Sequence, residues 1–423
     1  MTTETTTKRA SVLLLCALVT SYAYACMTRN CFSAAMVFIT AEGRLDNLQT
    51  GIISAAFYVL YAVFQVPGGF LIDKLKPEHF ITIGLLGAAG CNLVIFYNQS
   101  YPVMLSMWAL NGVLQFGVWP AIFKLASTMK APGMRRHALF IVTLGSPLGV
   151  LANYLVAAGI GENWRLNFLV SAVGLAAIAV LFEAVMFALR PSAAEREFLP
   201  ETVAEIDIPA YGTRFSTLLW SSGLVFILAL AFIRTGFDYA AKSLTPTMIS
   251  QSYDEVTPVL ATLLNVAVLV MSVAGTVLAY VLYPRFVKNE ATVLLVMFAL
   301  SLPPACLSLF VGRVAYPMIL LSCALIAMTM GAATLFTTSY IAARFNRYGH
   351  GATVAGLINC FSSLGIVAAF TLFPALSQSR FGWRGVGVSW VVLMSLAFLL
   401  CLVIRPLWSR FIAKNDTKSR RPD

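Results

Sequence analysis

Long apolar runs constrain this sequence more than any other feature. A helix of about twenty apolar residues spans the hydrocarbon core of a lipid bilayer, and the chain has a series of such runs, separated mostly by short polar segments. Hydrophobic residues make up 59% of the 423 residues and charged residues only 11%, a composition far from that of soluble globular proteins. The short alternating strands typical of a transmembrane barrel are absent from the sequence. The sequence therefore predicts an all-α membrane protein.

We predict twelve transmembrane helices in two blocks of six. They span residues 11–40, 50–72, 80–97, 103–126, 138–160, 166–189, 216–240, 257–283, 291–312, 316–341, 352–376 and 386–407. The longest linker lies between the sixth and the seventh helix. We therefore predict an N-terminal six-helix half (1–189), a cytoplasmic central linker (190–215), a C-terminal six-helix half (216–407) and a basic cytoplasmic tail (408–423).

The distribution of basic residues predicts the orientation of the chain. The formal net charge of +11 would by itself be compatible with binding nucleic acid. With the N-terminus in the cytoplasm, most lysines and arginines fall on the inner side. The outer side then has Arg44, Arg165, Lys242, Arg313, Arg380 and Arg384. Because cytoplasmic loops of membrane proteins are enriched in basic residues, we expect both termini inside, no nucleic-acid partner, and contacts with anionic membrane lipids.

Two sequence matches indicate an internal duplication. "NWR" at 163–165 precedes the sixth predicted helix, and "GWR" at 382–384 precedes the twelfth. "GSPLGVLA" at 145–152 in the fifth helix matches "FSSLGIVA" at 361–368 in the eleventh. We infer that six helices were duplicated to give two pseudo-symmetric halves. In membrane proteins built from such repeats, the binding site lies between the repeats near the membrane midplane.

Each predicted half has one arginine in its first helix. Arg29 lies in "YACMTRNCFSAAM" and Arg234 in "LALAFIRTGFDYA", at equivalent places along the two helices. An arginine at the bilayer centre costs about 3 kcal/mol or more, which pairing with protein groups or snorkelling to the membrane surface could offset. An anion bridging the two arginines would satisfy both, because a guanidinium group donates two parallel hydrogen bonds to phosphate or carboxylate oxygens. We therefore predict an anion-binding site with Arg29 and Arg234.

Several segments resemble a known family of membrane proteins. They are "RNCFSAAM" (29–36) in the first helix, "NGVLQFGVWPAIFK" (111–124) in the fourth, Arg234 and Gly236 in the seventh, and "TVAGLINCFSSLG" (353–365) in the eleventh. They are similar to the organophosphate:phosphate antiporter family of the major facilitator superfamily, which includes glycerol-3-phosphate and hexose-phosphate exchangers. The resemblance implies the twelve-helix major facilitator fold and an anion held by the two arginines.

The resemblance also implies further site residues. Tyr61 would donate a hydroxyl hydrogen bond to the anion. The cavity would be shaped by Gln65, Gln115, Trp119, Ser146, Asn359 and Ser363. In "GFLIDKLKPEH" (69–79), Asp73 and Lys74 match a superfamily motif that acts as a conformational latch.

Three of these positions depart from the family pattern. Gln65 stands where family members have a lysine, Ser146 where they have a histidine, and Ser363 where a tyrosine is usual. Without the lysine and the histidine, the site has less positive charge for a doubly charged phosphate. The anion could therefore be a phosphorylated compound, a phosphonate, a monoanionic phosphodiester or a carboxylate.

Asp238 lies four residues after Arg234 and hence on the same helix face. One interpretation is a local ion pair that eases the burial of Arg234. The other is that protonation of Asp238 frees Arg234 for the substrate, which would give proton-coupled symport instead of anion exchange.

The sequence favours a secondary active transporter, an antiporter or a symporter, that moves a small organic anion by alternating access. The alternative is a membrane receptor with a transporter fold that senses a phosphorylated metabolite. The sequence has no nucleophile elbow, P-loop or zinc-site spacing, so we expect no enzyme activity, no cofactor and no metal. We expect a monomer in a bacterial inner membrane.

Overall fold

The computed structural model describes residues 2–74, 76–127, 132–189, 215–286, 289–348 and 351–418, and these ranges contain helices and no strands. The chain forms two compact units. The first unit consists of Met1–Leu45 and Ala56–Asp207, and the second of Asp46–Ala55 and Ile208–Asp423. The first turns of the helix that starts at Asn47 therefore belong to the second unit. The predicted boundaries of the halves, the linker and the tail stay predictions.

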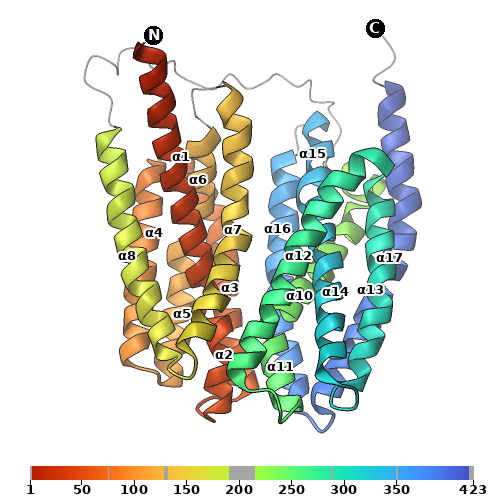
Figure 1. The fold of residues 1–423 in the computed structure, drawn as a ribbon. Helices are drawn as coiled ribbons and strands as arrows, with labels where there is room; N and C mark the ends of the chain where they lie inside the picture. Colours follow the sequence, from red (N-terminus) through yellow and green to blue (C-terminus); the bar gives the residue numbers. More distant parts are fainter. Residues whose placement is uncertain are drawn as a thin grey trace. The chain divides into compact units, whose positions relative to one another are not determined.

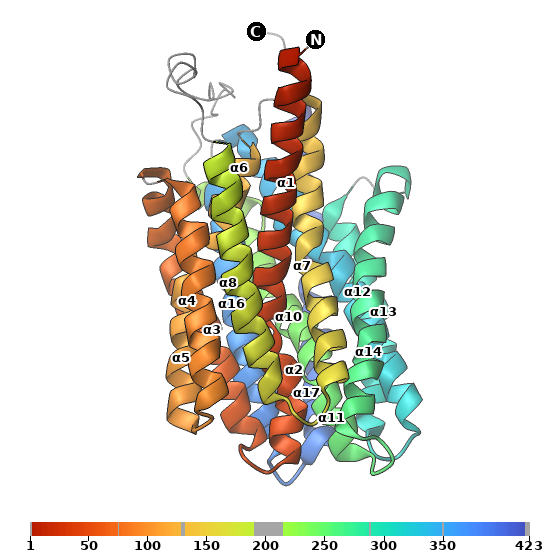
Figure 2. The ribbon, with the colours of Figure 1, turned by 60° about the vertical axis from the view of Figure 1, so that its left-hand side comes forward.

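The first unit is a bundle of long antiparallel helices (Figure 1). Its helices are α1 (Thr2–Arg29), α2 (Cys31–Ala41), α3 (Asn47–Lys74), α4 (Pro77–Tyr97), α5 (Tyr101–Gln115), α6 (Val118–Ser127), α7 (Pro132–Ile160) and α8 (Arg165–Ala188). Figure 2 shows α1 between α7 and α8, and α1 contacts both. Apolar side chains such as Leu18, Leu85, Ile122 and Phe182 form the core between α1, α4, α6 and α8.

The second unit is built in the same way. Its helices are α9 (Phe215–Ser221), α10 (Leu224–Ser243), α11 (Thr245–Ser252), α12 (Pro258–Phe286), α13 (Glu290–Leu307), α14 (Tyr316–Leu335), α15 (Ile341–Arg344), α16 (Gly351–Ser377) and α17 (Gly382–Lys418). A π-helical turn, Phe336–Tyr340, links α14 to α15. α10 packs against α14 and α16, and α12 packs against α14. The aromatic rings of Phe237, Phe373 and Trp390 meet in the core.

The membrane fold predicted from the apolar runs is confirmed. In the part of the chain that the structure describes, 10 helices are long and apolar enough to cross a membrane. The predicted span 103–126 corresponds to α5 and α6, which are separated by a turn at Phe116 and Gly117. The predicted span 138–160 corresponds to α7, of which Gly145–Ile160 is a shorter apolar helix. The protein is therefore an integral, multi-pass, all-α membrane protein, and the prediction of twelve spans is consistent with this structure.

Equivalent glycines make the same helix contact in each unit. A Cβ added to Gly149 of α7 would lie 2.1 Å from the backbone oxygen of Ala23 in α1, and one added to Gly365 of α16 would lie 2.1 Å from that of Phe232 in α10. Only glycine lets two helix backbones approach this closely. Gly149 and Gly365 occupy the same place in the matching segments "GSPLGVLA" and "FSSLGIVA". The matching segments therefore form equivalent helix crossings, α7 with α1 and α16 with α10. Arg29 lies in α1 and Arg234 in α10.

A buried carboxylate joins three helices of the second unit. Glu290, the first residue of α13, is 1% exposed. Its Oε1 accepts a hydrogen bond from Nε of Arg344 over 2.9 Å and lies 2.8 Å from Nη2 of the same side chain. Its Oε2 accepts a hydrogen bond from Nε1 of Trp408 over 3.0 Å. Trp408 and Phe411 are buried, so α17 continues as a packed helix into the region predicted to be the tail.

Candidate functional site

Arg29 is the last residue of α1 and is held by neutral groups. Its Nη2 donates a hydrogen bond to Oε1 of Gln115 over 3.4 Å. Its guanidinium carbon lies 4.9 Å from the ring centroid of Tyr61 and 5.9 Å from that of Phe57. An aromatic face and an amide oxygen stabilise a cation without cancelling its charge. The Nε of Arg29 is buried and has no hydrogen-bond partner among the described residues, so Arg29 keeps both its charge and an unused donor.

A break in the predicted first transmembrane helix determines where Arg29 lies. α1 ends at Arg29 and α2 starts at Cys31, with Asn30 at φ −101° and ψ 0° between them. At the break, Nδ2 of Asn30 replaces a backbone donor and bonds to the carbonyl of Cys26 over 2.8 Å. Nδ2 of Asn153 on α7 donates to the carbonyl of Asn30 over 2.9 Å, and Nδ2 of Asn167 on α8 donates to that of Cys31 over 3.2 Å. These two amides stabilise the break and with it the position of Arg29.

Gln115 supports Arg29. It is the last residue of α5, and its Nε2 donates a hydrogen bond to Oδ1 of Asn111 over 2.8 Å. Both side chains are fully buried. Because the amide nitrogen is engaged with Asn111, the amide oxygen of Gln115 faces Arg29. The Nδ2 of Asn111 has no partner among the described residues, which adds a second unused donor to this part of the first unit.

The other predicted site residues of the first unit lie on three helices. Tyr61 of α3 is buried and presents its ring face to the guanidinium group. Gln65 follows one turn later on α3. Trp119 of α6 packs on Tyr22 with ring centroids 4.5 Å apart, and Ser146 of α7 is partly buried. Their contacts with an anion, including the hydroxyl hydrogen bond of Tyr61, stay predictions.

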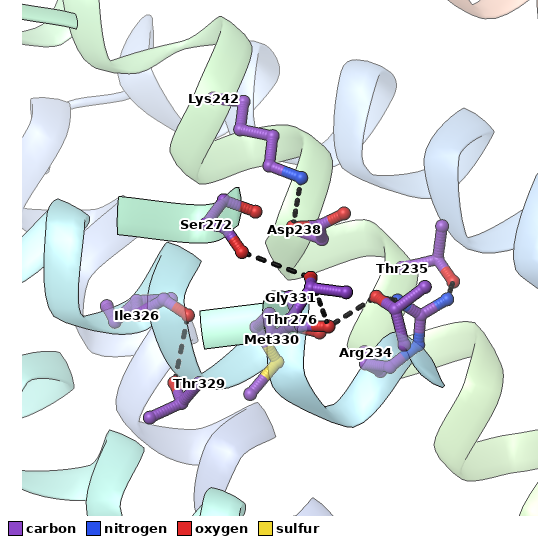
Figure 3. A network of polar contacts seen from close by, with 11 residues as sticks. Arg234, Thr235, Asp238, Lys242, Ser272, Thr276, Ile326, Thr329, Met330 and Gly331 are labelled. Atoms are coloured by element: carbon purple, nitrogen blue, oxygen red, sulfur yellow. Dashed lines mark hydrogen bonds and ion pairs between the residues drawn. The ribbon is translucent and has the colours of Figure 1, made fainter. Parts of the chain in front are cut away.

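Arg234 of α10 is also held by neutral groups and is 3% exposed. Its Nη1 donates to Oγ1 of Thr334 on α14. Its Nη2 donates to Oγ1 of Thr235 (Figure 3). The Thr334 hydroxyl donates its own hydrogen to the carbonyl of Met330 and the Thr235 hydroxyl to that of Ala231. Both hydroxyl oxygens therefore act only as neutral acceptors for the guanidinium group. The Nε of Arg234 has no partner within the described ranges.

Asp238 forms its ion pair with Lys242. Oδ1 of Asp238 lies 2.6 Å from Nζ of Lys242, one turn further along α10 (Figure 3). No hydrogen bond or ion pair joins Asp238 to Arg234 in the described part of the chain. Lys242 lies in the last turn of α10 with a side chain that is 24% exposed, and its place on the outer side of the membrane stays a prediction. A coupling role for Asp238 stays a prediction.

The remaining predicted site residues lie on α16 and α3. Ser363 of α16 is buried, and its hydroxyl donates to the carbonyl of Asn359 over 3.0 Å. Asn359 is exposed. Asp73 and Lys74 lie at the end of α3, but their side chains are outside the described residues, and the latch stays a prediction. Within the described ranges, no group of three or more His, Cys, Asp or Glu side chains could hold a metal ion.

Sequence reasoning included Gln115 and Tyr61 beside Arg29 but missed the threonine partners of Arg234. Thr334 is 100 residues from Arg234, and no sequence pattern indicates that contact. The ion pair between Lys242 and Asp238 could have been predicted from the sequence. Lys242 follows Asp238 by four residues, which is the spacing of neighbours on a helix face.

Comparison with known proteins identifies the family. The model of the Major Facilitator Superfamily matches residues 18–370. The chain belongs to this superfamily. The fold of the chain agrees with this assignment. It is similar to the crystal structure of a bacterial homolog of the human lysosomal transporter Spinster, with a TM-score of 0.70 and 13% sequence identity. The superposition covers 98% of this chain and 99% of the other chain.

Two similar proteins, one of them named as a hexose phosphate transport protein, bear out the resemblance to organophosphate transport proteins. The chain is 29% identical over 104 residues to a probable hexose phosphate transport protein of Chlamydia trachomatis, covering 25% of this chain and 23% of the relative. It is 26% identical over 161 residues to the membrane sensor protein UhpC of Salmonella typhimurium, covering 38% of this chain and 36% of the relative. The matched segments therefore span well under two thirds of either relative.

Proposed function

We propose that the protein is a secondary active transporter that moves a small organic anion across the membrane by alternating access, with Arg29 and Arg234 as its binding cations. The observation that carries the proposal is the same in both units. In each unit an arginine is held by uncharged groups and keeps an unused Nε donor that is buried. Ionisable residues within membrane spans are expensive and usually functional. A visiting anion would supply both the opposite charge and the missing hydrogen-bond acceptors.

A phosphorylated compound is the substrate class that the observations favour. Although the family lysine and histidine are absent, two guanidinium groups still supply two positive charges and paired donors for phosphate oxygens. One relative is named as a probable hexose phosphate transport protein. Phosphonates and carboxylates present similar oxygens and remain the other classes to compare. The protein would move the anion without changing its covalent bonds, as a monomer in a bacterial inner membrane with both termini in the cytoplasm.

Ligand-induced stabilisation of the purified protein tests this proposal. Glucose 6-phosphate, methylphosphonate and succinate would be compared by thermal shift, because a ligand at 100 times its Kd stabilises the folded state by about 2.7 kcal/mol. We expect submillimolar binding, about 4–8 kcal/mol, and a shift that is lost in both Arg29→Gln and Arg234→Gln. Arg410→Gln, which removes an exposed arginine from α17, should keep the shift. A shift that survives replacement of either Arg29 or Arg234 would refute the proposed site.

A receptor is the second candidate, and the similarity to the membrane sensor protein UhpC favours it. A receptor binds its anion without net turnover, whereas a transporter exchanges labelled and unlabelled anion across a vesicle membrane. Counterflow of labelled glucose 6-phosphate in proteoliposomes separates the two. Binding in the thermal-shift experiment without any counterflow would support the receptor and contradict transport.

The coupling mode needs a separate measurement. If protonation of Asp238 drives symport, uptake into proteoliposomes should depend on a pH gradient, and Asp238→Asn should abolish that dependence. If Asp238→Asn uptake still follows the pH gradient, the residue is not the coupling group. Uptake that needs internal phosphate and ignores the pH gradient would identify an antiporter.

A further inference from the structure

Three charged residues follow one another at one-turn intervals on α10 (Figure 3). Side chains four residues apart are neighbours on a helix surface, so the Asp238 carboxylate has a cation one turn before it, Arg234, and another one turn after it, Lys242. The structure pairs it with Lys242, with 2.6 Å between Nζ and Oδ1. Arg234 donates to threonine hydroxyls instead.

Burial makes this choice of partner important. Arg234 is 3% exposed and Asp238 is 6% exposed. Charges attract each other much more strongly away from water, and a buried carboxylate is costly without a cation beside it. An ion pair between Asp238 and Arg234 would cancel the charge of the guanidinium group and weaken its attraction for any other anion. In the structure, the cation that the carboxylate contacts is the Lys242 ammonium group.

We propose that Lys242 is a positioning residue for the anion site: its ammonium group holds the Asp238 carboxylate and thereby keeps the positive charge of Arg234 available to the substrate. This inference rests on the proposed function, since it concerns the anion that Arg234 binds. Two other roles of the pair make different predictions. The pair could stabilise only the fold, or Lys242 could contact the anion itself.

Two single substitutions and their combination distinguish these roles. The variants are Lys242→Gln, Asp238→Asn and the double variant, and the probes are glucose 6-phosphate and inorganic phosphate. The apparent Kd is measured by titrating the purified proteins, and Tm is measured without ligand. We expect Lys242→Gln to raise Kd about tenfold or more, because Asp238 then turns to Arg234. Asp238→Asn should leave Kd unchanged or lower it, and the double variant should return to within about threefold of the wild type.

The comparison is informative because both single substitutions break the same ion pair. A role limited to fold stability predicts that they lower Tm together and change Kd in the same direction, and that result would overturn the inference. Direct contact of Lys242 with the anion predicts that the double variant still binds as weakly as Lys242→Gln. That result would overturn it as well. Recovery of binding in the double variant is the outcome that supports positioning.

A charge-swapped variant keeps the test decisive if Lys242→Gln does not fold. Asp238→Lys combined with Lys242→Asp retains an ion pair at the same two positions and moves the carboxylate two turns away from Arg234. We expect it to bind phosphate at least as tightly as the wild type. A Kd raised about tenfold or more would contradict the positioning role.

Arg234→Gln separates this inference from the proposed function. If Arg234→Gln binds the probes like the wild type, or if the wild type binds none of them, the proposed function fails and the inference with it. If Arg234→Gln loses binding while Lys242→Gln and Asp238→Asn change Kd in the same direction, only the role of Lys242 is refuted.

Discussion

At the scale of single residues, the hydrogen-bond and ring partners of Arg29 and Arg234 have no charge. Arg29 contacts an amide oxygen and two aromatic rings, and Arg234 contacts two hydroxyl groups. A carboxylate in either place would hold the arginine more strongly but would neutralise it. Neutral acceptors orient a guanidinium group and leave its charge for a ligand. This explains why Gln115, and not a glutamate, suits the position beside Arg29.

Gln115→Glu tests that explanation with a substitution that barely changes the shape of the side chain. A carboxylate beside Arg29 would form an ion pair away from bulk water, where such pairs are strong. We expect the variant to fold with an unchanged or higher Tm and to lose at least about tenfold in affinity for glucose 6-phosphate. Gln378→Glu, at an exposed position, controls for the added negative charge. Unchanged binding in Gln115→Glu would show that the charge of Arg29 is not used.

At the scale of helices, the repeated glycine contacts bring α7 against α1 and α16 against α10. Gly149→Ala and Gly365→Ala would place a methyl group against a backbone oxygen, which a side-chain rotation cannot relieve. We expect each to lower the free energy of unfolding by about 1–3 kcal/mol, measured by denaturation in detergent.

The same helices provide matched controls for the two glycines. Gly159 on α7 and Gly356 on α16 have nothing within 4 Å of an added Cβ. Their alanine variants should be neutral or up to about 1 kcal/mol more stable, since alanine is the better helix former. If alanine lowers the free energy of unfolding equally at Gly149, Gly365 and the two control positions, the close approach of the helix backbones is contradicted.

The stability of the protein should depend differently on Arg344 and Glu290, the two charged residues of this cluster. Arg344→Met leaves a carboxylate that is 1% exposed without a cation, and we expect it to destabilise the protein by about 3–5 kcal/mol. Glu290→Gln should cost less, because the Arg344 side chain is 34% exposed and can reach water. The amide oxygen of the glutamine can still accept the Trp408 hydrogen bond. Thermal unfolding of both variants checks which one loses more stability. A larger loss of stability in Glu290→Gln than in Arg344→Met would contradict this prediction.

At the scale of the whole molecule, the basic residues predict how the chain crosses the membrane. Fusion of alkaline phosphatase, which is active only outside the cytoplasm, after Glu162 should give active enzyme. Fusion after Leu189, at the other end of α8, should give inactive enzyme because that end would lie in the cytoplasm. The opposite pattern of activities would invert the predicted topology.

The fold was largely predictable, and the details of the site were not. Apolar length and the matched segments predicted a duplicated helical membrane protein, because each is a local property of the chain. The interruption at Asn30 was not predicted, since "YACMTRNCFSAAM" has no proline or glycine to indicate a break. Asn153 and Asn167, which stabilise the break, come from helices more than a hundred residues away.

The sequence by itself determined that this chain folds in a membrane and that one arginine per repeat lies in an apolar helix. It did not determine which group holds each charge. Asp238 lies one turn from Arg234 and one turn from Lys242, and helix spacing permits either ion pair. Only the tertiary structure decided between them, because α14 presents the Thr334 hydroxyl to Arg234 and leaves the carboxylate to Lys242.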